Sequence, residues 1–268
     1  YSAGAVATAT GVVAIGYEAG TAITSGSGNI TIGYEAGKTI ATASFNTYVG
    51  YQSGVGDGTQ HSRNTGLGYQ TLTANTSGEN NTMVGNQAGD GITSGSQNTG
   101  VGDSVAFDID ANNQTAIGYQ ATTDSANDIA IGNTSVDEVK GQVDFSTFSD
   151  RRIKKDIIDG DLGLDFINNL KVRKFKKVNP AKYPKSIKKP NDGKGMEWTD
   201  AQANKVWDGL IAQEVKEAID KSKTTFSGWS EESNSKQLVG YSTMVIPLIK
   251  AVQELSAKVE ELEAKLSK

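Results

Sequence analysis

The fold of the first half is decided by one repeated stretch, which reads Ala14-Ile15-Gly16-Tyr17-Glu18-Ala19-Gly20 and again Thr31-Ile32-Gly33-Tyr34-Glu35-Ala36-Gly37. A small or β-branched residue, an aliphatic residue and a glycine are followed by polar and small residues. The unit occurs eight times, and its marker glycines are separated by 14 to 18 residues: Gly16, Gly33, Gly50, Gly68, Gly85, Gly102, Gly118 and Gly132. A fixed period of this kind indicates a stacked repeat architecture.

One unit has room for two brief strands and two turns, and no helix fits beside them. Clusters of Gly, Ser and Asn such as 25–29 and 94–98 predict turns between the units. A single unit has too few apolar groups to bury a face, so the units must stack as a solenoid. We expect the aliphatic residue before each marker glycine to point inward, and the glycine to permit a tight bend or a close backbone approach.

Two sets of side chains in the repeats admit a functional interpretation. The first set is the tyrosines at the same position of the repeat: Tyr17, Tyr34, Tyr51, Tyr69 and Tyr119. They form either an exposed aromatic ladder that binds glycans or a packing element between coils. Packing is favoured, because aromatic residues at a fixed position of a repeat are usually structural.

The second set is four aspartates that could bind calcium: Asp57, Asp90, Asp103 and Asp108. Their spacing matches no known calcium-binding loop, so no metal or cofactor is predicted.

The composition changes abruptly near residue 149. Residues 1–148 contain 13 acidic and 3 basic residues, a net charge of −10, together with 24 of the 31 glycines. Residues 149–268 contain 18 acidic and 23 basic residues, a net charge of +5. This shift predicts a domain boundary. The basic residues are interleaved with acidic ones, so nucleic-acid binding is not predicted.

Several classes of protein are excluded or disfavoured by composition. The chain has no cysteine, which excludes disulfides and thiolate sites. No apolar run reaches the length of a membrane span, so membrane insertion is not expected. Because the sequence starts at Tyr1, we expect it to be a fragment of a longer chain.

The second half has a mixed pattern. Apolar residues at helical spacing predict a short helix over 161–170, and alternation predicts a strand over 172–178. Residues 179–205 predict a loop or insertion because they contain three prolines. Residues 209–219 predict a strand running into a helix, and Trp229 with Leu238 predicts a hairpin.

The C-terminus carries a heptad seam. Its apolar residues are spaced alternately three and four apart: Val245, Leu248, Val252, Leu255, Val259, Leu262 and Leu266. Such a seam predicts a helix over 244–268 that associates with another helix, in another copy or in its own domain.

The repeats resemble the head repeats of trimeric autotransporter adhesins (YadA-like head repeats) and of related phage fibre proteins. The resemblance rests on the Ile-Gly-Tyr-x-Ala units, often preceded by Asn-Thr, over residues 11–135. It implies a left-handed β-roll and a homotrimer. The units here are slightly longer than the commonest form, which predicts larger loops.

The second half resembles the intramolecular chaperone domain of phage tailspikes and tail fibres, the endosialidase-type peptidase family S74. Three motifs carry the resemblance: Ser149-Asp150-x-Arg152-x-Lys154, Gly209-x-Ile211-Ala212-Gln213-Glu214-Val215, and Tyr241 leading into 249–255. The family's domain promotes trimerisation and folding of the preceding β-structure and then cuts itself away. Carried over, the resemblance implies Ser149 as the nucleophile, Lys154 as the general base and Phe148–Ser149 as the scissile bond. Asp150, Arg152, Gln213 and Glu214 are the supporting residues of these motifs.

The chemistry of this dyad can be judged from the residues. A serine hydroxyl needs a base, and the only histidine, His61, lies in the repeats. Lysine is an alternative base if burial or neighbouring cations lower its pKa, and Arg151, Arg152 and Lys155 lie nearby. The competing interpretation is that Ser149 or Asp150 caps a helix whose basic residues are solvated.

We therefore predict β-roll repeats over 1–135, a connector over 136–148 and an α+β chaperone domain over 149–268. The predicted function is a fibre or adhesin tip that attaches to a receptor on a host or prey surface, such as a glycan. It would belong to a virion tail or a bacterial surface fibre, and cleavage would be a single self-processing turnover with no external substrate. The alternative is a permanently attached, non-cleaving trimerisation tip. A third class, a membrane-released DNA-binding factor, is disfavoured by the acidic repeats.

Overall fold

The computed structural model describes residues 8–57, 61–136, 138–142, 145–188, 198–232 and 235–267. The chain divides into two compact units, the first holding 1–138 with 180–183 and 188–196, and the second holding the remainder. The main division, between Glu138 and Val139, falls inside the predicted connector.

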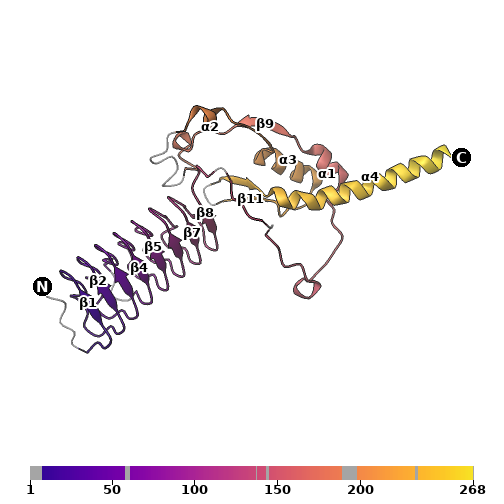
Figure 1. Cartoon of the computed structure of the whole chain (residues 1–268). Helices are drawn as coiled ribbons and strands as arrows, with labels where there is room; N and C mark the ends of the chain where they lie inside the picture. The colour runs from indigo at the N-terminus through magenta and orange to yellow at the C-terminus, as the bar shows by residue number, and fades with distance from the viewer. Residues whose placement is uncertain are drawn as a thin grey trace. The chain divides into compact units, whose positions relative to one another are not determined.

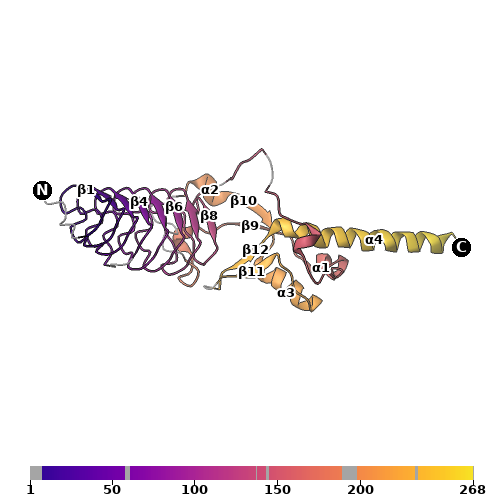
Figure 2. The same cartoon turned by 90° about the horizontal axis from the view of Figure 1, so that it is seen from below.

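The first unit is a parallel β-solenoid, as predicted. Its eight strands pair in sequence order, and each strand lies one coil from its neighbours, with Val13 opposite Ile30 in the first pair. Figures 1 and 2 show the short strands stacked along the coils. The structure describes one strand per coil, so the expectation of two was wrong. The strands are β1 (Val13–Ile15), β2 (Ile30–Ile32), β3 (Thr47–Val49), β4 (Thr65–Leu67), β5 (Thr82–Val84), β6 (Thr99–Val101), β7 (Thr115–Ile117) and β8 (Ile129–Ile131).

The aliphatic residue before each marker glycine does not point into the solenoid, which corrects the prediction. Ile15 is 58% exposed and Ile117 is 44% exposed, whereas the middle residue of a strand, such as Met83 or Ala116, is fully buried. Side chains alternate along a strand, so turning the middle residue inward turns both of its neighbours outward. The outward stripe, formed by the third residue of each strand, is apolar in every coil: Ile15, Ile32, Val49, Leu67, Val84, Val101, Ile117 and Ile131.

The thin interior is filled by matching large and small residues in adjacent coils. Tyr48 is fully buried, and the inward position of the next coil is Gly66, where a Cβ atom would lie 3.0 Å from the Tyr48 ring. Met83 is followed in the same way by Gly100, where a Cβ atom would lie 2.6 Å from the Met83 sulfur. Interiors of proteins are close-packed, so each large side chain requires the glycine beside it.

The marker glycines are required by close backbone approach, as predicted. Gly16 and Gly33 have φ angles of 130° and 132°, which residues with a side chain rarely adopt. A Cβ atom on Gly16 would also collide with the carbonyl oxygen of Gly33 in the next coil.

A ladder of buried amides runs through the coils. The asparagine ladder consists of Asn29, Asn46, Asn64, Asn81 and Asn98, each fully buried, and Gln114 continues it. Each side-chain oxygen accepts a hydrogen bond of 2.9 Å from the backbone N–H of the next member. Several side-chain amides also donate to turn carbonyls, as Asn81 does to Gly95 at 2.9 Å. The ladder therefore satisfies polar groups that the solenoid interior removes from water.

Four tyrosines stack along the coils. The ring centroids of Tyr17, Tyr34, Tyr51 and Tyr69 are 5.1, 5.1 and 5.3 Å apart, and the ring planes are nearly parallel. The faces of the inner rings are therefore covered by neighbouring rings. This favours the packing interpretation, because a sugar that stacks on tyrosine needs an open ring face.

The part of the chain after residue 139 has mixed α and β structure, as predicted. Its elements are η1 (Arg151–Ile153), α1 (Leu164–Asn169), β9 (Arg173–Lys176), η2 (Pro180–Lys182), α2 (Asp200–Asn204), β10 (Val206–Gly209), α3 (Ala212–Ser222), β11 (Trp229–Glu231), β12 (Gln237–Val239), η3 (Tyr241–Met244) and α4 (Val245–Leu266). The pairs β9–β10 and β11–β12 are antiparallel. The predicted insertion 179–205 contains η2 and α2, and residues 189–197 of it lie outside the described part.

The core of the second unit is small. Phe166 of α1, three residues of α3 and Met244 of η3 are buried together, with Leu162 and Phe226 packed against them. Most of α4 extends beyond this core as a single long helix (Figure 1), and its heptad residues from Val252 onward are 45 to 88% exposed. The described helices include none that is long and apolar enough to cross a membrane.

Candidate self-cleavage site

The predicted serine and lysine lie next to each other. The Lys154 ammonium donates a hydrogen bond of 2.7 Å to Ser149 Oγ. Local structure produces this contact, because Asp150 is the N-cap of η1 and its carboxylate accepts a bond of 2.8 Å from the Arg152 N–H. The turn of η1 brings the chain back so that the residue five positions after the serine meets it.

Asp150 and Arg152 form a second pair beside the dyad. The Arg152 guanidinium donates to both carboxylate oxygens of Asp150, at 3.0 Å from Nε and 2.7 Å from Nη2. The hydrogen bond from Arg152 lowers the pKa of Asp150. The capping interpretation and the dyad interpretation are therefore compatible. Asp150 caps η1, and the turn of η1 brings Lys154 to Ser149.

The dyad is open to solvent in the single chain. Every described residue from 145 to 160 is exposed, including both dyad members. A lysine acts as a base only when it is neutral, and burial is the main way to favour the neutral form. One of the three cations expected to help, Arg152, is paired with Asp150. The single chain therefore brings the two dyad side chains into contact but leaves them open to water.

The predicted scissile bond is also accessible. Phe148 is 91% exposed and Phe145 is 95% exposed, and the described residues of the connector lie outside helices and strands. Phe148 therefore presents exposed apolar surface directly beside the candidate cleavage site, and exposed apolar surface can mark an interaction site.

Gln213 and Glu214 lie at the start of α3, apart from the dyad in their interactions. Glu214 accepts two hydrogen bonds from Arg173 of β9, at 3.0 and 2.6 Å, and Lys171 lies 3.8 Å away. Within the described residues, neither Glu214 nor the exposed Gln213 hydrogen-bonds to Ser149 or Lys154. Glu214 therefore ties β9 to α3.

We expect Arg173→Gln to raise the pKa of Glu214. The hydrogen bond from Arg173 is the largest cause that lowers this pKa, ahead of the charges of Arg173 and Lys171. A pH titration of the Glu214 side chain by NMR measures the shift, and Lys174→Gln, which removes a cation paired with Asp208 instead, is the control. An unchanged titration of Glu214 in Arg173→Gln would contradict the assignment.

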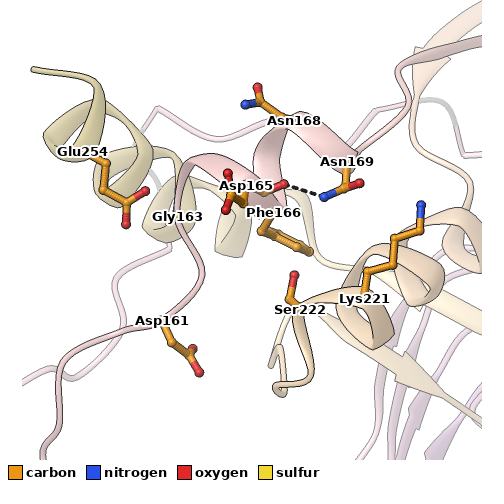
Figure 3. Close-up of a pocket in the computed structure, with 9 residues that line it drawn as sticks. All are labelled: Asp161, Gly163, Asp165, Phe166, Asn168, Asn169, Lys221, Ser222 and Glu254. Carbon is orange, nitrogen blue, oxygen red and sulfur yellow. Dashed lines mark hydrogen bonds between the residues drawn. The ribbon is translucent and has the colours of Figure 1, made fainter. Parts of the chain in front are cut away.

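Two further motif residues have structural roles that the sequence did not indicate. The Tyr241 hydroxyl accepts a hydrogen bond of 2.8 Å from the Leu210 N–H, between β10 and α3. Glu254 of α4 accepts one of 2.8 Å from the Leu164 N–H at the start of α1, and a Cβ atom on Gly163 would collide with its carboxylate (Figure 3). Both residues belong to the third motif of the family resemblance, which marked them in the sequence without indicating these contacts.

The pocket in Figure 3 lies where α1, α3 and α4 meet and has a volume of about 520 Å³. Its polar lining includes Asp161, Asp165, Lys221 and Glu254. No group of three His, Cys, Asp or Glu side chains in the described part of the chain is arranged to hold a metal ion. At this pocket, the hydrogen bond from Leu164 N–H to Glu254 joins α1 to α4, whereas that from the Asn169 amide to the Asp165 carbonyl lies within α1 (Figure 3).

A comparison with protein families finds a match that starts at the first residue of the dyad, Ser149. Residues 149–223 match Peptidase_S74, chaperone of endosialidase. This S74 segment begins at Ser149 and ends just after α3, so it contains the dyad, Arg173 and Glu214. The repeats and α4 lie outside it. No curated protein and no solved structure was found to match the chain.

Proposed function

We propose that the chain is the end of a trimeric fibre whose second unit assembles three copies and then cuts itself away before Ser149. The observation that carries the proposal is that the S74 segment starts at the serine whose Oγ lies 2.7 Å from Lys154 Nζ. An intramolecular chaperone explains why a lysine-rich unit follows a glycine-rich solenoid in one chain.

The outward stripe supports assembly of the solenoid. It presents one aliphatic residue per coil at the same phase, and several are more than 40% exposed, including Ile15, Val101 and Ile131. A contiguous exposed apolar face marks an interaction site. Its most direct occupant is the identical stripe of other copies, because the rung spacing then agrees on both sides.

The heptad seam supports assembly at the other end. Val252, Leu255 and Leu262 are 51 to 61% exposed on α4. A seam with period 3.5 is buried when helices of neighbouring copies pack together. Three copies would thus be joined through their β-rolls and through α4.

The cleavage step follows from the positions of the groups. Ser149 Oγ attacks the carbonyl carbon of Phe148 while a neutral Lys154 takes the hydroxyl proton. The C–N bond breaks, the Ser149 nitrogen receives a proton and becomes an amine, and an ester joins Phe148 to Ser149 Oγ. Water then hydrolyses the ester. The released β-roll would serve attachment to a host or prey surface, as part of a virion tail or a bacterial surface fibre.

One observation favours the alternative of a permanent trimerisation tip that does not cleave. Both dyad residues are exposed, and an exposed lysine is a poor base. Under the leading proposal, assembly must cover the dyad before cleavage.

The test is the intact mass and denaturing gel mobility of the expressed chain beside Ser149→Ala, Lys154→Ala and Lys185→Ala. The wild type and Lys185→Ala are expected to split between Phe148 and Ser149, while the two dyad variants stay whole. Lys185 is the matched control because it is an exposed lysine far from the dyad in sequence and is not among the cations expected to act on Lys154. Four full-length chains would leave the permanent tip as the function, and light scattering reports separately whether each is a trimer.

A further inference from the structure

An apolar groove on the second unit is not filled by any of the residues that the structure describes. It has a volume of about 460 Å³ and is lined by Ile167, Leu170, Val172, Leu210, Met244 and Leu248. Met244 at its base is only 7% exposed, whereas Val172 and Leu248 are 78% and 46% exposed. The groove therefore opens from the small core to solvent, and its size falls in the range of sites that hold small apolar groups.

The same unit contains an aromatic side chain without a binding site. Phe148 is 91% exposed although it immediately precedes the proposed nucleophile. The Ser149–Lys154 hydrogen bond and the Asp150 cap hold the next residues in a turn, so the connector enters this turn with its phenyl ring in water. The fold of one chain thus leaves both the groove and the ring uncovered.

We propose that this groove binds Phe148 of a second copy and so selects the bond that is cut. The groove is continuous with the core cluster, because Ile167, Leu170 and Leu210 pack against that cluster. A phenyl ring in the groove would therefore be in contact with a packed apolar surface rather than a mobile one. Apolar burial of this kind is favourable in proportion to the area removed from water.

The occupant is another copy because a second copy brings both missing surfaces together. Within one chain the Phe148 side chain remains almost fully exposed. In a cyclic trimer, each copy can place its Phe148 in the groove of the next copy, so that every groove is filled. The inference rests on the proposed trimer and self-cleavage. It adds a role for assembly, since docking Phe148 carries the adjacent dyad against an apolar wall, and removal of water favours the neutral form of Lys154.

The absence of cysteine in the chain makes a cross-linking test direct. A tagged chain carrying Thr147→Cys, which keeps the Phe148 ring, and Ser149→Ala, which cannot cleave, is refolded with an untagged Ser149→Ala chain carrying Val172→Cys. A disulfide needs Cα atoms within about 7 Å, so a tagged–untagged product reports that the connector reaches the groove of another copy. Leu248→Cys, on the other exposed wall, is the second probe, and Lys221→Cys, an exposed position that does not line the groove, is the control.

The product with Val172→Cys or Leu248→Cys is expected to exceed that with Lys221→Cys by at least about tenfold. On the unaltered chain, Phe148→Ala is expected to slow cleavage about tenfold or more and Phe148→Leu less, because leucine still fills an apolar groove. Trimers by light scattering with no enriched product would overturn the groove assignment and leave the trimer standing. Chains that stay monomeric would overturn both.

Discussion

Asn81→Asp is expected to lower the free energy of unfolding of the β-roll by about 3–5 kcal/mol at pH 7. The side chain of Asn81 is fully buried in the asparagine ladder. Its oxygen accepts a hydrogen bond from Asn98 N–H, and its amide donates to the carbonyl of Gly95, both at 2.9 Å. A carboxylate keeps the first bond but places a negative charge against the Gly95 oxygen, and the hydrogen-bond partners described for Asn81 include no cation to compensate it.

The effect has a defined pH dependence. Burial raises the pKa of the new carboxyl group above the ordinary aspartate value of about 3.9, so the folded variant binds a proton more tightly than the unfolded chain. Stability of the variant therefore falls as pH rises through this range, and the loss is smaller at pH 4 than at pH 7.

Urea unfolding followed by circular dichroism at both pH values measures these changes. The matched control is Asn80→Asp, which makes the same substitution one residue earlier at an exposed position. Asn80 has a φ of 58°, a conformation that aspartate also tolerates. Equal unfolding midpoints for the two variants would show that the ladder does not contribute as described.

Val101→Lys is expected to weaken association of the copies by at least about 100-fold while the single-chain fold is retained. Val101 is 42% exposed in the outward stripe, so a lysine there meets solvent in one chain. In a symmetric trimer paired through the stripe, three ammonium groups would approach one another and lose water. Association would then cost more than the aliphatic contact contributes.

Analytical ultracentrifugation over a range of concentrations measures the change. Ser77→Lys, an exposed turn position outside the stripe, supplies the same charge as a control. A trimer that persists in Val101→Lys as it does in Ser77→Lys would exclude the stripe as the interface.

The sequence predicted the solenoid because the glycine markers keep one phase, and Gly16 and Gly33 do meet backbone to backbone. It could not tell which side of a strand faces inward. In Thr99-Gly100-Val101 the most apolar residue lies outside, because Gly100 leaves room for Met83 of the neighbouring coil. Such compensation is visible only when adjacent coils are aligned in space.

At the candidate site, too, some features were predicted from the sequence and others are visible only in the structure. The spacing of Ser149 and Lys154 was read from sequence, and the structure places their side chains at 2.7 Å. The expectation that neighbouring cations act on Lys154 did not anticipate that Asp150 pairs with Arg152. The role of Glu214 was also not accessible, because its partner Arg173 lies 41 residues away and on another element.

The sameness of the outward stripe has a consequence for assembly. Because every coil presents an aliphatic residue at an equivalent place, two stripes displaced by one coil, about 4.8 Å, would still match along nearly their whole length. The misaligned pairings would form a set of nearly degenerate states, differing mainly by one unpaired coil at each end. The β-roll alone therefore holds little information about which alignment is correct. That information must come from a part of the chain whose contacts occur only once.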